Sequence, residues 1–171
     1  MKKFIAFMLL AALVLTAFVG CSSSDGKDGG ASGPDAAVKS YVSTLYSKAD
    51  PSKSEVKSLK PAKMWEEEGN FDDAYEEFLE ERAYYIEMAI EEYGEDYKVT
   101  CEILSKEKMS AEELKEGQEA FEEYYGLDSK KLTDAYNLEF EITFKGSEGE
   151  ESVVQNAVAY KYDGTWYAEA D

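Results

Sequence analysis

The chain contains no histidine, and this absence limits the chemistry open to its other reactive side chains. Without an imidazole there is no Ser-His or Cys-His nucleophile pair, no histidine metal ligand and no side chain that ordinarily titrates near neutral pH. A carboxylate base is possible, but among 37 acidic residues and 13 tyrosines no spacing singles out one residue for this role. We therefore predict a protein that is not an enzyme and needs no cofactor, with a small enzyme using a carboxylate and tyrosine pocket as the alternative.

The spacing of the acidic residues is the next candidate for chemistry. Glu66, Glu67 and Glu68 are consecutive, and between residues 72 and 81 carboxylates recur four residues apart, on shared helix faces. Calcium prefers such oxygens, but it also needs a loop that surrounds the ion, and the EF-hand spacing is missing. The sequence predicts a solvated acidic surface without a metal site, and weak divalent-cation binding is the alternative.

Tyrosines can contact a ligand because each combines an apolar ring with a polar hydroxyl group. They occur as pairs at residues 84–85 and 124–125, and again near the end of the chain. Their helical and strand spacing favours packing in the core for most of them. The candidate ligand-binding residues are Tyr160, Tyr162 and Tyr167.

Residues 1–21 have the pattern of an export signal. Two lysines follow the initial methionine, an apolar run covers residues 4–19, and Gly20 precedes Cys21. The last four residues, Phe-Val-Gly-Cys, resemble a lipobox, apart from a phenylalanine where leucine is usual. At such a site the thiol takes a diacylglycerol group, so we predict that Cys21 is lipidated. The apolar run is slightly shorter than the roughly 17–25 residues of a membrane span, and an uncut anchor or ordinary secretion is the alternative.

The anchor predicts where the mature protein lies. Two acyl chains hold a protein on a bilayer far better than one, since each buried methylene contributes about 0.8 kcal/mol. Residues 22–33 contain no large apolar side chain and predict a flexible linker spanning roughly 20 Å. The expected location is the extracytoplasmic face of a bacterial cell membrane.

The remaining residues, 34–171, predict a single domain of ordinary size. Loss of Lys2 and Lys3 with the signal leaves 16 basic and 37 acidic residues, a formal net charge of −21. Nucleic acid is excluded as a partner, because phosphate binding needs a basic surface and Arg82 is the only arginine. Anionic headgroups are repelled as well, so the diacylglyceryl anchor is the expected membrane attachment.

The second cysteine has no predicted partner. With Cys21 lipidated, Cys101 cannot form an intramolecular disulfide, so the domain must be stabilised by packing. Cys101 alternates with polar residues in a strand pattern and belongs to its apolar face. We predict a buried structural thiol, because no imidazole is present to lower its pKa.

The hydrophobic pattern predicts helices before a sheet. Expected helices cover 34–49, 52–60, a long segment from an Asn70 cap to Gly94, and 110–126 with a capping box at its start. Expected strands cover 97–104, 136–145, 153–162 and 165–169. Asp163-Gly164 is a strong signal for the last hairpin, which places Trp166 beside Lys161 and over small residues as a packing element.

This order predicts an α+β domain with helices packed on one face of a curved antiparallel sheet. The element order and the final hairpin, residues 160–167, resemble lipoproteins of Gram-positive bacteria with a nuclear-transport-factor-2-like (cystatin-like) domain of unknown function. The resemblance implies a cone-shaped domain and no particular activity. The predicted function is a membrane-anchored, non-catalytic ligand- or partner-binding module of the cell envelope. A deep tyrosine-lined cavity would favour a ligand, and a filled interior with an exposed apolar patch would favour a protein partner.

Overall fold

The computed structural model describes residues 31–67 and 69–170. The predicted signal peptide, the lipidation site Cys21 and most of the predicted linker lie outside these residues. Within the described part of the chain, no helix is both long enough and apolar enough to cross a membrane.

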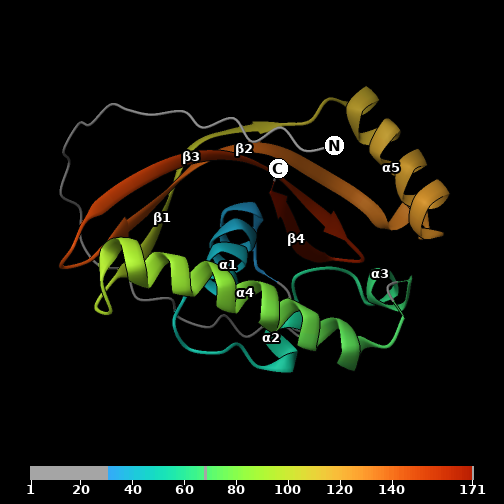
Figure 1. The fold of residues 1–171 in the computed structure, drawn as a ribbon. Coiled ribbons are helices and arrows are strands. Elements are labelled where there is room, and N and C mark those ends of the chain that lie inside the picture. Colours follow the sequence, from blue (N-terminus) through green and yellow to red (C-terminus); the bar gives the residue numbers. More distant parts are fainter. Residues whose placement is uncertain (1–30, 68, 171) are drawn as a thin grey trace, which may run out of the picture.

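The fold is α+β, as predicted, with one open sheet of four antiparallel strands in the order β1-β2-β3-β4 (Figure 1). Each strand pairs with the next one along the chain. Asp163 and Gly164 both have positive φ angles, 50° and 87°, which confirms the predicted tight hairpin between β3 and β4. The strands are β1 (Lys98–Lys108), β2 (Leu132–Lys145), β3 (Glu150–Tyr162) and β4 (Thr165–Ala170).

Helix boundaries follow the local capping chemistry. Asn70 accepts a hydrogen bond from the backbone of Asp72 at the start of the long helix, and Ser110 forms the predicted capping box with Glu113. The short helix after Pro61 was not predicted. The segments are α1 (Pro34–Tyr46), α2 (Lys53–Lys57), α3 (Ala62–Glu67), α4 (Phe71–Tyr93), α5 (Ala111–Tyr125) and a 3₁₀ turn η1 (Ser129–Lys131).

The main core lies between α1 and the concave face of the sheet. Figure 1 shows the sheet arching over α1, with α4 running below it. Phe140 and Ile142 of β2 are almost fully buried against Val38 and Val42 of α1. Trp166 is 9% exposed, pairs with Lys161 and belongs to this core, so its predicted packing role is confirmed.

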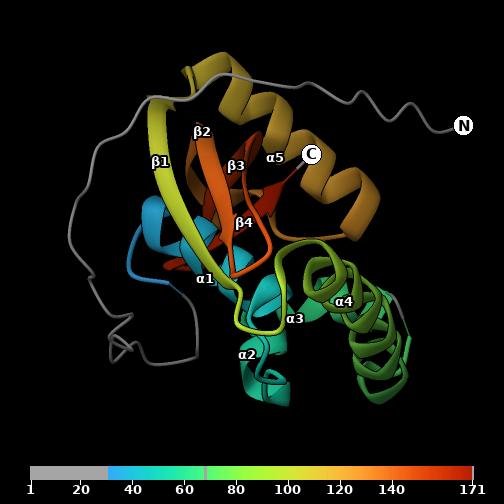
Figure 2. The same ribbon diagram turned by 60° about the vertical axis from the view of Figure 1, so that its left-hand side comes forward.

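A second cluster lies on the opposite face of the sheet. Consecutive strand residues point to opposite faces, and Ala159 belongs to the α1 core while Tyr160 packs with Phe121 of α5. In Figure 2 the strands lie between α5 and α1. The expectation that all helices lie on one face is therefore wrong for α5, because its half-buried residues, such as Leu114 and Phe121, find an apolar surface on the other side of β2 and β3.

Candidate functional site

The three candidate tyrosines lie close together in the cluster beneath α5. Tyr160 is 3% exposed, stacks on Tyr167 with 5.7 Å between ring centroids, and meets the ring of Phe121 at 5.0 Å. Burial, and then the neighbouring Glu169, raise the pKa of Tyr160 far above its ordinary value, and its hydroxyl donates to Glu169 Oε1 at 3.2 Å. Tyr162 is half-buried, with its ring 6.3 Å from Phe121. The structure thus brings the three together as packed neighbours, and ligand binding by them stays a prediction.

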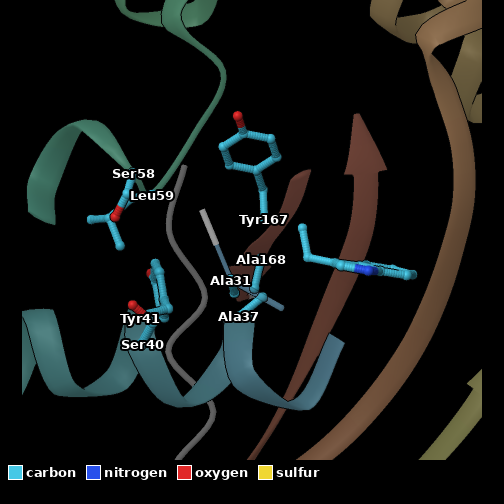
Figure 3. A pocket seen from close by; sticks show the side chains of 9 residues that line it. Ala31, Ala37, Ser40, Tyr41, Ser58, Leu59, Tyr167 and Ala168 are labelled. Carbon is cyan, nitrogen blue, oxygen red and sulfur yellow. The ribbon is translucent and has the colours of Figure 1, made fainter. Parts of the chain in front are cut away.

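Tyr167 also lines a small cavity between α1, the end of α2 and β4 (Figure 3). Tyr41, Leu59 and Trp166 form other parts of its wall. The cavity volume is about 10 Å³, enough for about one water molecule. Burial raises the pKa of Tyr41 to about 12, so its hydroxyl is neutral at physiological pH. This space is too small for an organic ligand.

Cys101 lies on the concave face of β1, opposite Ile142, and is half-buried. Burial raises the pKa of its thiol to about 11, so the thiolate needed for nucleophilic attack is scarce at neutral pH. The predicted place on an apolar strand face is confirmed, but the thiol is half-buried rather than fully buried, because β1 is an edge strand of the sheet. Within residues 31–67 and 69–170, no three His, Cys, Asp or Glu side chains converge as a metal site would require.

An enzyme of the alternative type needs a buried carboxylate that faces an open pocket. Asp134 has a buried Oδ1 atom, but Lys108 Nζ lies 3.0 Å from that atom as an ion pair without hydrogen-bond alignment. Asp134 lines neither the cavity beside Trp166 nor the groove beside α4 that contains Ile86 and Ile90. Its charge is therefore neutralised by a lysine rather than presented to a substrate.

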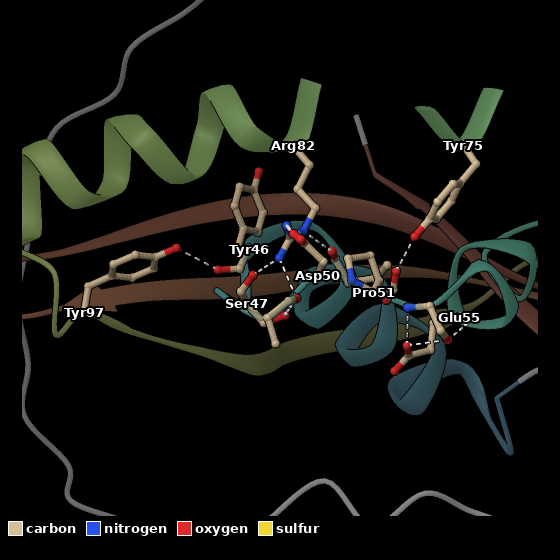
Figure 4. A network of polar contacts seen from close by, with 11 residues as sticks. Tyr46, Ser47, Asp50, Pro51, Glu55, Tyr75, Arg82 and Tyr97 are labelled. Atoms are coloured by element: carbon tan, nitrogen blue, oxygen red, sulfur yellow. Dashed lines mark hydrogen bonds and ion pairs between the residues drawn. The ribbon is translucent and has the colours of Figure 1, made fainter. Parts of the chain in front are cut away.

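The most connected polar group of the structure is Arg82, which is 2% exposed and reaches from α4 to the end of α1 (Figure 4). Its Nε donates to the carbonyl oxygen of Thr44 at 3.0 Å, and one terminal nitrogen donates to the carbonyl oxygens of Ala49, at 2.7 Å, and Ser47. The other terminal nitrogen donates to Asp50 Oδ1 at 2.8 Å. The last carbonyls of a helix lack partners within the helix, and a cation there is favoured by the helix dipole. Arg82 therefore acts as a clamp on the C-terminal end of α1.

Two tyrosines hold the same segment, also seen in Figure 4. Tyr75 of α4 donates a hydrogen bond to the carbonyl oxygen of Pro51 at 2.8 Å, and Tyr97 donates to the carbonyl oxygen of Tyr46 at 3.1 Å. Residues 44–51 are thus fixed against α4 at several points. A fixed loop beside a long helix can form the wall of a binding groove.

An open groove of about 400 Å³ lies between this loop and α4. Its volume is within the roughly 300–1,000 Å³ range of ligand pockets, but the groove is open to solvent and does not enclose a small molecule as such pockets do. Lys48 at one wall donates to the carbonyl oxygen of Glu95 at 2.7 Å, so its ammonium group is already engaged. The groove combines apolar side chains with carboxylates and is lined by Lys48, Asp50, Arg82, Ala83, Ile86, Glu87, Ile90 and Glu91.

Apolar side chains are exposed on the outer side of the same helix. Tyr84 is 60% exposed and Met88, one helical turn later, is 47% exposed. The ring centroids of Tyr84 and Tyr85 lie 5.9 Å apart, and those of Tyr85 and Tyr46 of α1 lie 6.2 Å apart. Tyr85 therefore connects the exposed ring of Tyr84 to α1.

No pattern in the sequence marks this groove. Arg82 falls at helical spacing between the apolar residues Phe78 and Ile86, and a lone arginine at such a position is the signal that could have found the clamp. The partners of Arg82 are backbone carbonyls, which no residue type in the sequence marks.

No family model, no curated protein and no solved structure matches this chain. The functional assignment therefore depends on the chain's own residues and their geometry.

Proposed function

We propose that this protein is a lipid-anchored lipoprotein on the extracytoplasmic face of a bacterial membrane, and that its folded domain binds a partner protein of the cell envelope without catalysis. The observation that carries the anchor is the sequence pattern of residues 1–21, in which an apolar run ends at Gly20-Cys21. A polar, glycine-rich stretch follows at once and separates the membrane from the domain.

The packed tyrosines and the open shape of the groove beside α4 favour a protein partner over a small, enclosed ligand. Tyr160, Tyr162 and Tyr167 pack against one another and Phe121, and the cavity nearest to Tyr167 has room for about one water molecule. Large apolar side chains instead lie on the surface, where they mark interaction sites when they are contiguous.

The cystatin-like classification is part of the same proposal. It is supported by the resemblance of the final hairpin and by an antiparallel sheet that curves over α1. A cystatin-like domain does not imply a particular reaction, so the classification is compatible with a binding protein.

Metabolic labelling with a clickable fatty-acid analogue tests the anchor in intact cells. The natural protein and the Cys101→Ser variant should both incorporate the label and stay with the membrane fraction. The Cys21→Ser variant should incorporate none, because its thiol is the expected acceptor. Label retained on Cys21→Ser would overturn the proposed function.

A further inference from the structure

The outer surface of α4 carries apolar side chains that the fold does not cover. Tyr84 and Met88 are four residues apart and therefore adjacent on the helix, where they form a continuous exposed ridge. The inner side of α4, with Arg82, Ala89 and Tyr93, is the side buried against the domain. The ridge is thus free for a partner.

Two carboxylates separate this ridge from the groove. Glu87 lies three residues after Tyr84 and three before Ile90, so the geometry of a helix places it between them. Glu91 has the same relation to Met88. Both carboxylates are exposed, and neither forms an ion pair or hydrogen bond with another residue of the described chain. The surface therefore alternates apolar, acidic and apolar stripes across about half of the helix.

We propose that this surface binds a segment of another envelope protein in which lysine or arginine residues alternate with apolar residues. The cations pair with the carboxylates while the apolar side chains cover the ridge, and one long side chain enters the groove. This inference rests on the proposed function as a partner-binding protein. We call the surface the α4 docking face, formed by Tyr84, Ile86, Glu87, Met88, Ile90 and Glu91.

Charge complementarity favours this occupant over others. A second copy of the mature chain carries the same formal charge of −21, and its own α4 docking face would bring carboxylates against carboxylates. A purely apolar segment would bury Glu87 and Glu91 without partners, which is costly. An anionic membrane surface is repelled by the same charges. A cationic, apolar segment satisfies both kinds of stripe.

Fluorescence anisotropy with two labelled octapeptides tests the proposal. One peptide alternates lysine with leucine, and the other alternates lysine with serine, so both carry the same charge. Each is titrated with the lipidated protein in a zwitterionic detergent and with the unlipidated Cys21→Ser chain. The variants are the double substitution Tyr84→Ala/Met88→Ala and the matched control Tyr124→Ala, whose tyrosine is 72% exposed on the equally acidic helix α5. Circular dichroism confirms that each variant is folded.

We expect the lysine–leucine peptide to bind at least tenfold more tightly than the lysine–serine peptide. The double substitution should weaken the lysine–leucine peptide at least tenfold, and Tyr124→Ala should change its affinity less than twofold. Equal affinity for the two peptides, or an equal loss in the double substitution and in Tyr124→Ala, would overturn the α4 docking face and leave only non-specific attraction to an acidic protein.

The comparison of the lipidated protein with the unlipidated Cys21→Ser chain separates this proposal from the anchor. Peptide affinity should be the same with and without lipid, because the α4 docking face lies in the folded domain. A natural protein that carries no lipid but discriminates between the peptides would refute the anchor and support the docking face. A lipidated protein that binds both peptides equally would support the anchor and refute the α4 docking face.

Discussion

Replacing Arg82 with methionine should destabilise the domain by about 3–5 kcal/mol, because the clamp on α1 loses every polar contact while much of the side-chain volume is kept. The carbonyl of Thr44 is buried with its residue, 7% exposed, and would be left without a partner, at a cost of about 1–3 kcal/mol. The carbonyls of Ser47 and Ala49 lie nearer to solvent and lose a hydrogen bond each, about 1 kcal/mol apiece. The ion pair with Asp50 adds little, because the Asp50 side chain is 79% exposed.

Urea unfolding followed by circular dichroism measures this loss, and two further variants test its origin. Asp50→Asn should cost at most about 1 kcal/mol, since it removes an exposed charge only. Arg82→Lys should lose most of the stability that methionine loses, because a single ammonium group cannot reach acceptors that a planar guanidinium contacts on several sides. A loss below about 1 kcal/mol for Arg82→Met, or a loss for Asp50→Asn as large as that of Arg82→Met, would refute the clamp.

Three further predictions concern the core and the thiol. Trp166→Ala should cost about 3–5 kcal/mol in the same unfolding assay, and a loss below about 1 kcal/mol would mean that the ring does not pack in the core. Gly146→Ala should destabilise the domain by about 3 kcal/mol or more, because the added Cβ would lie 1.9 Å from the carbonyl oxygen of Tyr93. Gly117→Ala should instead stabilise helix α5 by about 0.5–1 kcal/mol, because its Cβ would meet only Leu132, at 3.6 Å. Similar effects of the two substitutions would contradict the close approach at Gly146. Alkylation of Cys101 should stay slow until the pH approaches 11, and rapid alkylation at pH 8 would contradict the burial of the thiol. The folded state holds the thiol proton more tightly than the unfolded state does, so the free energy of unfolding should fall as the pH rises from 9 to 11. This fall should be larger in the natural protein than in Cys101→Ser.

Local chemistry made many of the elements predictable. The Asn70 and Ser110 caps and the Asp163-Gly164 turn each depend on residues close in the sequence, and the structure has them where the sequence predicts. The boundaries that differ depend on distant contacts. The first helix ends at Tyr46 rather than at residue 49, because Arg82 of α4 donates to the carbonyl oxygen of Thr44, which would accept from the amide of residue 48 if the helix continued.

The side of the sheet chosen by α5 could not be predicted from periodicity. Alternation shows that Ala159 and Tyr160 point in opposite directions, but it does not show which helix covers each face. The groove could not be predicted from the sequence either, because only the tertiary packing of α1 against α4 brings Lys48 and Asp50 close to Ile86 and Ile90. The acidic surface predicted from the sequence covers residues 66–68 and 72–81, and no residue type in the sequence distinguishes Glu87 and Glu91 from the other carboxylates.

The proposed anchor holds the mature protein on the membrane through Cys21. Intact-mass and N-terminal peptide mass spectrometry of the protein purified from membranes examines this bond itself. We expect a mature chain that begins at Cys21, with a diacylglyceryl group joined to its Sγ atom through a thioether. A chain that retains residues 1–20, a chain that begins at Cys21 with a free thiol, or a chain that begins after residue 21 would refute the anchor.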